Sequence, residues 1–383
     1  MRIVHVTDGY LPRLGGIEVQ VHDLATQQRL RGHDVTVVTR SAAAGHQDSL
    51  PTVRLDGPRW SVAAAADVLS RADVVHCHTS LVSPLALWAV LAARTAGTPA
   101  VVTAHSLPPV SGASGLAVAF GARALGRDVV WTAVSGVAAR SVETVVGRFV
   151  QVLPNGIDLA AWSPSPRPVG EVLTVVTVMR LCARKRALPL VEILAGIRDR
   201  LDPAVGLRAV VIGDGPQRES VQRRVRRHGM QDWVRMTGRL DRTAIAGHLA
   251  AAHVFLAPAT LESFGIAALE ARSVGVPVVA MRAGGVGDFV RDGVEGLLVD
   301  SDSEMASAAA GLLASPGTLQ RMRGHNVTST AGLDWDSVLR TCSRVYARAG
   351  APVPALETAA LATSVIRAPV GTVGQRVERV LAA

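Results

Sequence analysis

Two positively charged side chains follow a predicted apolar strand in the second half of the chain. Arg180 and Lys185 come just after a strand that ends at Val178. A guanidinium offers a planar pair of donors and an ammonium offers a compact charge, so together they suit the oxygens of a diphosphate. Arg184 and Arg186 adjoin them, and a solvated basic loop is therefore the alternative interpretation. Lys185 is the single lysine among 40 basic residues, which favours a specific role for it.

Two carboxylates lie around the start of another predicted helix. Glu262 is expected in the loop before this helix, and Glu270 within its second turn. A carboxylate only accepts hydrogen bonds, so this pair suits sugar and ribose hydroxyls and not phosphates. The amides of Phe264, Gly265 and Ile266 would form a free helix N-terminus beside them. Taken singly, helix capping by Glu262 and surface exposure of Glu270 are the simpler interpretations.

Glycine loops and one histidine also stand at predicted strand ends. Gly15 and Gly16 open a predicted helix after the first strand, and Gly213 follows a later apolar strand. Glycines in such places let backbone amides approach phosphate, although each could equally form a tight turn. His105 follows the strand 100–103, where a histidine more often has a structural role.

Strands that alternate with helices must position these loops. Apolar strands are predicted near residues 2–7, 35–39, 74–77, 100–103, 129–134 and 150–153, and then near 175–178, 208–212, 234–237, 254–257, 276–280 and 296–299. This rhythm predicts two Rossmann-like, doubly wound parallel sheets of the α/β class, covered by helices on both faces. Ligands bind such sheets beyond the carboxyl ends of the strands, where the candidate residues lie.

The chain is predicted to divide into four segments. Its 383 residues suit two domains. We interpret the stretch rich in proline and glycine at 154–170 as the linker between them. We assign residues 1–160 to an N-terminal acceptor-side domain and 161–333 to a C-terminal donor domain. Residues 334–350 form a helix expected to pack back on the first domain, and 351–383 form a low-complexity tail.

Composition narrows the partners and the compartment. The longest apolar runs are shorter than the roughly 18 residues that a membrane-spanning helix needs. The N-terminus does not resemble a secretory signal, and the three cysteines are isolated. These features predict a cytoplasmic protein with reduced thiols and no zinc site.

The formal charge of +9 would suit nucleic acid or an anionic membrane surface. Aromatic residues make up only 3% of the chain, which leaves few stacking platforms and argues against nucleic acid. Residues 115–127 mix apolar and arginine side chains, which indicates either a helix that docks on an anionic membrane or an ordinary surface helix.

The motifs together resemble those of glycosyltransferase family 4, which has the GT-B fold, and the resemblance runs from about residue 2 to 346. It rests on these segments in this order: Gly15-Gly16-Ile17-Glu18, Pro154-Asn155-Gly156-Ile157-Asp158, Arg180 to Lys185, Gly213-Asp214-Gly215-Pro216, Glu262 with Glu270, Gly275-Val276-Pro277-Val278-Val279-Ala280, and Gly284-Gly285. Each motif is weak alone, and their joint order and spacing are specific.

The resemblance implies two Rossmann-like domains facing a cleft, a C-terminal crossover helix, and retaining transfer of a hexose from a nucleotide-sugar donor. It implies that Arg180 and Lys185 hold the diphosphate, that Glu262 binds the transferred sugar, and that Glu270 binds the ribose. His105 matches the family's active-site histidine beside that sugar. Donor-binding backbone is implied at Gly15, Gly16, Gly213 and residues 264–266.

The same resemblance implies an acceptor that is a carbohydrate or a lipid-linked glycan precursor, and a peripheral position at the inner face of the membrane is a further expectation. No metal or other cofactor is expected, and Asp300-Ser301-Asp302 is interpreted as a helix cap. Two positions depart from the family pattern, since Met179 and Arg186 stand where many relatives have glycine. Asp288 replaces a frequent glutamate. The alternative function is a nucleotide-sugar epimerase or hydrolase on the same scaffold.

Overall fold

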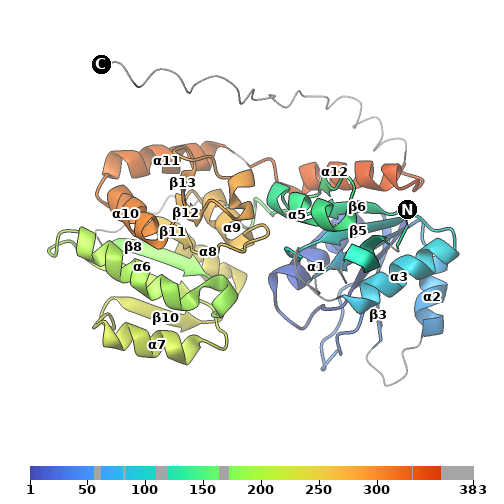
Figure 1. Ribbon diagram of the computed structural model, residues 1–383, viewed down its shortest axis with the longest axis horizontal. Coiled ribbons are helices and arrows are strands. Elements are labelled where there is room, and N and C mark those ends of the chain that lie inside the picture. The colour runs from blue at the N-terminus through green and yellow to red at the C-terminus, as the bar shows by residue number, and fades with distance from the viewer. Residues whose placement is uncertain are drawn as a thin grey trace, which may run out of the picture.

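Two parallel sheets form the framework of the molecule. The computed structural model describes residues 1–55, 62–80, 83–108, 119–123, 125–126, 128–163, 172–329 and 331–354. The first sheet has the order β3-β2-β1-β4-β5-β6-β7 and the second the order β10-β9-β8-β11-β12-β13. Every pairing between these strands is parallel. The two lobes lie side by side in Figure 1, which confirms the predicted GT-B architecture.

The strands and helices of the first lobe are β1 (Arg2–Thr7), α1 (Gly16–Leu30), β2 (Asp34–Thr39), β3 (Thr52–Arg54), α2 (Val62–Ser70), β4 (Val74–Thr79), α3 (Pro84–Thr95), β5 (Ala100–Ala104), β6 (Val130–Ala133), α5 (Gly136–Val146) and β7 (Gln151–Val152). The central strands are buried on both faces, because helices cover each side of the sheet. Their near-continuous runs of valine and alanine follow from this burial. The edge strand β3 was not predicted, since three half-buried residues carry no periodic signal.

The second lobe contains β8 (Leu173–Val178), η1 (Ala183–Lys185), α6 (Ala187–Arg200), β9 (Leu207–Ile212), α7 (Arg218–Arg227), β10 (Val234–Gly238), α8 (Arg242–Ala250), β11 (Val254–Ala257), α9 (Ile266–Ser273), β12 (Val278–Met281), η2 (Gly285–Asp288), β13 (Gly296–Val299), α10 (Asp302–Leu313) and α11 (Pro316–Thr328). Each of its six predicted strands is present. Ser301 caps α10 by accepting the amide of Glu304, as the capping interpretation of this motif requires.

The last helix, α12 (Trp335–Arg348), returns to the first lobe (Figure 1). Its apolar face, from Trp335 to Tyr346, joins the core that includes Ile3, Val35 and Val37. The two chain crossings between the lobes lie against each other, since the amide of Ile157 donates to the carbonyl of Leu333 at 2.9 Å. The two lobes are thus joined through this paired crossing.

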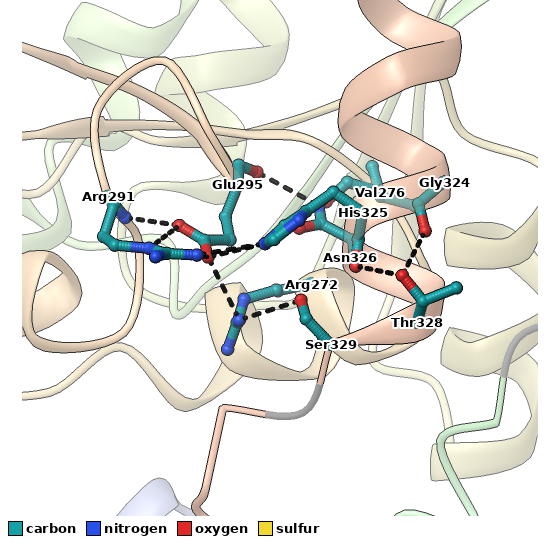
Figure 2. A network of polar contacts seen from close by, with 9 residues as sticks. All are labelled: Arg272, Val276, Arg291, Glu295, Gly324, His325, Asn326, Thr328 and Ser329. Carbon is teal, nitrogen blue, oxygen red and sulfur yellow. Dashed lines mark hydrogen bonds and ion pairs between the residues drawn. The ribbon is translucent and has the colours of Figure 1, made fainter.

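A buried polar network fixes the end of α9 in the second lobe (Figure 2). Glu295, which is 1% exposed, accepts hydrogen bonds from Arg291 and His325 and forms an ion pair with Arg272 of α9 at 3.4 Å. Burial acts to raise the pKa of Glu295, but the hydrogen bonds from Arg291 and His325 outweigh it and lower the pKa to about 2. The network therefore holds α9, which also carries Glu270, against β13 and α11.

All three cysteines are free. Within the described part of the chain, no helix has both the length and the apolar character needed to cross a bilayer. Residues 115–118, 124 and 127 of the segment 115–127, and residues 355–383 of the tail 351–383, lie outside the described residues, so the membrane-docking helix and the low-complexity tail both remain predictions.

Candidate functional site

The loop after β8 carries both predicted cations. Its backbone is tied to the glycine loop after β9, because the amide of Leu181 donates to the carbonyl of Asp214 at 2.9 Å. Gly213 has a φ of 127°, and a Cβ there would lie 1.9 Å from the carbonyl oxygen of Met179. Only glycine permits this approach. The amide of Gly213 donates to Gly238, so this residue shapes the loop and its amide is already occupied.

Lys185 lies in η1 and forms an ion pair with Glu262, which lies 77 residues later in the loop after β11. The side chains are 32% and 16% exposed, so both remain within reach of a ligand. An anionic ligand that took Lys185 as its partner would release the Glu262 carboxylate to accept from hydroxyl groups. The structure thus brings together the cation and the acid that the sequence had placed in different loops.

Arg180 is exposed, and among the described residues nothing pairs with its guanidinium. Arg186, by contrast, has a left-handed φ of 60° and binds both oxygens of Asp302 at 2.7 and 2.8 Å. Glycine, which the family resemblance leads us to expect at this position, adopts such a backbone without strain. Because Asp302 is engaged by Arg186, it serves the fold of the loop.

Two glycines hold the Glu262 loop in place. The amide of Gly285 donates to the carbonyl of Glu262 at 2.8 Å, and a Cβ on Gly285 would lie 2.4 Å from the carbonyl oxygen of Ser263. A Cβ on Gly284 would lie 3.1 Å from the Cβ of Glu262. Larger residues here would displace the loop. The Gly284-Gly285 motif therefore fixes the position of the acid.

The N-termini of two helices, one from each lobe, lie close together. Helix α9 begins at Ile266 after Gly265, with no side chain capping it, and Phe264 anchors this turn against Phe289. Helix α1 begins at Gly16 after Gly15, also without a side-chain cap. A Cβ on Gly16 would lie 4.0 Å from the Ile266 side chain. Among the described residues no side chain caps either start, and the positive dipole ends of the two helices favour an anion nearby.

His105 lies immediately after β5 and contacts the other lobe. Its carbonyl accepts a hydrogen bond from the Ser263 hydroxyl at 2.6 Å, which places it beside the Glu262 loop. Burial lowers the pKa of the His105 imidazole to about 4. At neutral pH the ring is therefore uncharged and acts as a hydrogen-bonding group.

Further contacts between the lobes surround this region. The Ser135 hydroxyl donates to the Ser263 carbonyl, and the amide of Gly136 donates to Asp288 at 2.6 Å. Asp288 thus binds the N-terminus of α5 in the opposite lobe, a role that its position near Gly284-Gly285 did not reveal. An ion pair between Arg242 and Asp23 joins α8 to α1.

A small cavity lies beside the site, next to the two chain crossings between the lobes. It is lined by His76, His78, His105, Asn155 and Trp335, among others, and does not include Arg180, Lys185 or Glu262. We locate the candidate site at the facing helix ends and the Lys185–Glu262 pair, because the charges and free amides are there. The cavity adjoins this site through His105.

Glu270 lies on α9 near the Arg242–Asp23 pair, and burial raises the pKa of its carboxyl to about 8. The folded protein therefore holds a proton on Glu270 that an unfolded chain releases at a pH of about 4.3. Protonation of Glu270 therefore adds to the free energy of unfolding. This contribution is fully present at pH values below the pKa of the unfolded chain, and it is lost as the pH rises through about 8.

We predict that Glu270→Gln removes a pH-dependent loss of stability on the order of a few kcal/mol. Thermal unfolding of the variant and of wild type between pH 5 and pH 8 measures this pH dependence of stability. Glu219→Gln is the matched control, because that side chain is 86% exposed. Parallel pH profiles for wild type and Glu270→Gln would show that the carboxyl is ionised throughout.

Sequence reasoning missed several residues of this region. Ser135 and Ser263 carry no motif, and their contact depends on how the lobes meet. His76 and His78 alternate along β4, so they share one face of the sheet, and this spacing was the available signal.

Comparison with known proteins shows consistent matches along the chain. Residues 14–161 match the family model described as Glycosyltransferase Family 4, and residues 161–325 match Glycosyl transferases group 1. A GDP-mannose-dependent alpha-(1-6)-phosphatidylinositol monomannoside mannosyltransferase of Mycobacterium tuberculosis is 32% identical, over 82% of this chain and 89% of that protein. A phosphatidylinositol N-acetylglucosaminyltransferase polypeptide of Arabidopsis thaliana is 29% identical, over 91% and 82%.

The fold has close matches among solved structures. Anabaena HepE in complex with UDP-glucose superimposes with a TM-score of 0.76 at 21% identity, over 91% of this chain and 99% of that one. A sucrose-phosphate synthase from Thermosynechococcus elongatus superimposes with a TM-score of 0.71 at 22% identity, over 91% and 98%.

Proposed function

The chain belongs to glycosyltransferase family 4, and we propose that it transfers a hexose, with retention of anomeric configuration, from a nucleoside-diphosphate sugar to a hydroxyl acceptor. The observation that carries this proposal is the contact between Lys185 and Glu262, beside two neighbouring helix N-termini that have no side-chain cap. The Lys185 ammonium can bind a diphosphate, while the Glu262 carboxylate accepts hydrogen bonds from the attached sugar. Family membership disfavours the epimerase or hydrolase alternative.

In the proposed mechanism, Arg180 and Lys185 bind the diphosphate and balance the negative charge that grows as the glycosidic bond breaks. Fixed cations at a developing charge are often the largest single catalytic contribution. The amides at Gly16 and residues 264–266 add donors to the same oxygens. The proposal requires no metal cofactor, because these groups supply the positive charge.

Glu262 accepts hydrogen bonds from the transferred sugar, and Glu270 faces the ribose. His105, uncharged at neutral pH, lies beside the sugar. The leaving phosphate oxygen takes the proton of the acceptor hydroxyl on the face from which it departs, so the new bond forms on that same face. This front-side route gives retention.

We further propose a glycolipid acceptor met at the cytoplasmic face of a membrane. The names of the relatives from Mycobacterium tuberculosis and Arabidopsis thaliana both refer to phosphatidylinositol lipids. The formal charge of +9 would favour an anionic lipid surface.

A thermal-shift screen of UDP, GDP, ADP and their sugars tests the donor assignment. A ligand at 100 times its dissociation constant stabilises a folded protein by about 2.7 kcal/mol, so one nucleotide series should raise the melting temperature clearly. The proton NMR spectrum of the product formed with that donor should show the same anomeric configuration as the donor. An inverted product, or no stabilisation by any nucleotide, would contradict the proposal.

A further inference from the structure

Four buried histidines form a continuous row beneath the site. His5 on β1, His76 and His78 on β4, and His105 after β5 are between 0% and 9% exposed. Strands β1, β4 and β5 are neighbours in the sheet, which places these rings together. His5, His76 and His78 are close enough to suggest a metal site. However, each of their ring nitrogens already has a hydrogen-bond partner, so we interpret the row as a hydrogen-bond relay.

One line of this relay runs from α1 to His105. The Oε1 atom of Gln28 lies 2.6 Å from His5 Nε2. His5 Nδ1 lies 2.9 Å from His78 Nε2, and His78 Nδ1 lies 2.9 Å from His105 Nε2. Burial lowers the pKa of all three imidazoles, so each ring carries one proton at neutral pH.

The direction of every hydrogen bond follows from Gln28. Its carbonyl oxygen can only accept, so the proton of His5 is on Nε2 and its Nδ1 must accept from His78. The proton of His78 is then on Nε2, and its Nδ1 accepts from His105. His105 therefore carries its proton on Nε2 and keeps a lone pair on Nδ1.

A second line fixes the orientation of the Gln28 amide. Its Nε2 donates to the hydroxyl of Tyr346 on α12 at 3.0 Å. That hydroxyl lies 2.9 Å from His76 Nδ1, and His76 Nε2 lies 2.7 Å from the Thr103 hydroxyl. The Thr132 hydroxyl donates to the Val102 carbonyl, so the Thr103 hydroxyl donates to Thr132 and accepts from His76 Nε2. His76 Nδ1 then accepts from the Tyr346 hydroxyl, which is left to accept from the Gln28 amide nitrogen. A reversed amide would turn its carbonyl oxygen toward Tyr346 and conflict with this direction. Helix α12, which crosses from the second lobe, thus contributes Tyr346 to the hydrogen-bond relay.

We propose that Gln28 is a positioning residue that, through His5 and His78, sets the tautomer of His105 and so presents its Nδ1 lone pair to the hydroxyls of the donor sugar. This inference rests on the proposed function for the place of His105 beside the sugar. The tautomer itself follows from the hydrogen bonds alone.

The test uses the full chain with nitrogen-15 in its histidines. Long-range proton–nitrogen spectra at neutral pH distinguish Nε2–H from Nδ1–H rings, and the signal lost in His105→Asn identifies His105. We expect wild-type His105 to be the Nε2–H tautomer. Gln28→Met removes the acceptor at similar length, and we expect a mixture of both tautomers and a fall in kcat of up to about tenfold, the size of one hydrogen bond. The donor KM should change little.

Gln27→Met is the matched control, because it makes the same change on the same helix away from the relay and should alter neither readout. Tyr346→Phe gives a second test, because it frees the Gln28 amide to turn. This variant should also yield a mixture of the two His105 tautomers. Wild-type His105 with its proton on Nδ1, or a single Nε2–H tautomer in both folded variants, would overturn the proposal. A tautomer shift without any change in kcat would leave the relay standing and refute the place of His105 beside the sugar.

Discussion

Lys185→Ala is expected to lower kcat by about 10²- to 10³-fold, as the loss of one electrostatic group at a developing charge does in other enzymes. The loop after β8 holds this ammonium against Glu262 of the loop after β11. An arginine there would differ in shape and in hydration, so Lys185→Arg should recover only part of the rate. Steady-state kinetics at saturating donor measure both effects.

Stability should change little, because an ion pair this exposed contributes no more than about 1 kcal/mol. Arg184→Ala is the matched control, since it removes one positive charge from the same short helix η1. It should keep most of the activity. Equal rates in wild type and Lys185→Ala with a verified donor would show that Lys185 does not bind the donor diphosphate.

Glu262→Ala is expected to lower kcat/KM by about 10²-fold or more, because hydrogen bonds to a charged acceptor contribute about 1.5–3 kcal/mol each and sugar hydroxyls can supply more than one. Gly284 and Gly285 lie so close to the backbone of this loop that the truncated side chain should leave the loop in place. Glu262→Gln keeps the shape and should retain part of the activity. Initial rates at low donor concentration measure kcat/KM directly.

A control for Glu262→Ala must separate the lost contact from the lost negative charge. Glu219→Ala removes an acid from the surface of the same lobe, where the side chain is 86% exposed, and should leave the rate unchanged. If Glu262→Ala bound and turned over donor as wild type does, the carboxylate would not contact the sugar.

The framework was predictable because it depends on local patterns. Parallel strands covered on both faces need apolar runs, and such runs mark the strand positions in both lobes. The edge strand β3 was missed because residues 52–54 are only half buried. The glycines at 213 and 285 carried a weak signal, and the structure shows the backbone contacts that require them.

The chemistry of the site depended on tertiary structure. The pair of Lys185 and Glu262 joins loops 77 residues apart, and no local pattern predicts it. The raised pKa of Glu270 comes from burial at the lobe boundary. The relay needs Gln28 and Tyr346 to meet through α12, a contact between residues 318 positions apart. The alternating histidines on β4 were visible in the sequence, but their partners were not.

The most direct test of the proposed donor site is a crystal structure of the protein with an intact nucleotide sugar. We expect diphosphate oxygens bound by Lys185 and Arg180 near the N-termini of α1 and α9, with the sugar hydroxyls donating to Glu262. A diphosphate bound elsewhere, with Lys185 still paired to Glu262 and the gap between the helix ends empty of ligand, would contradict it.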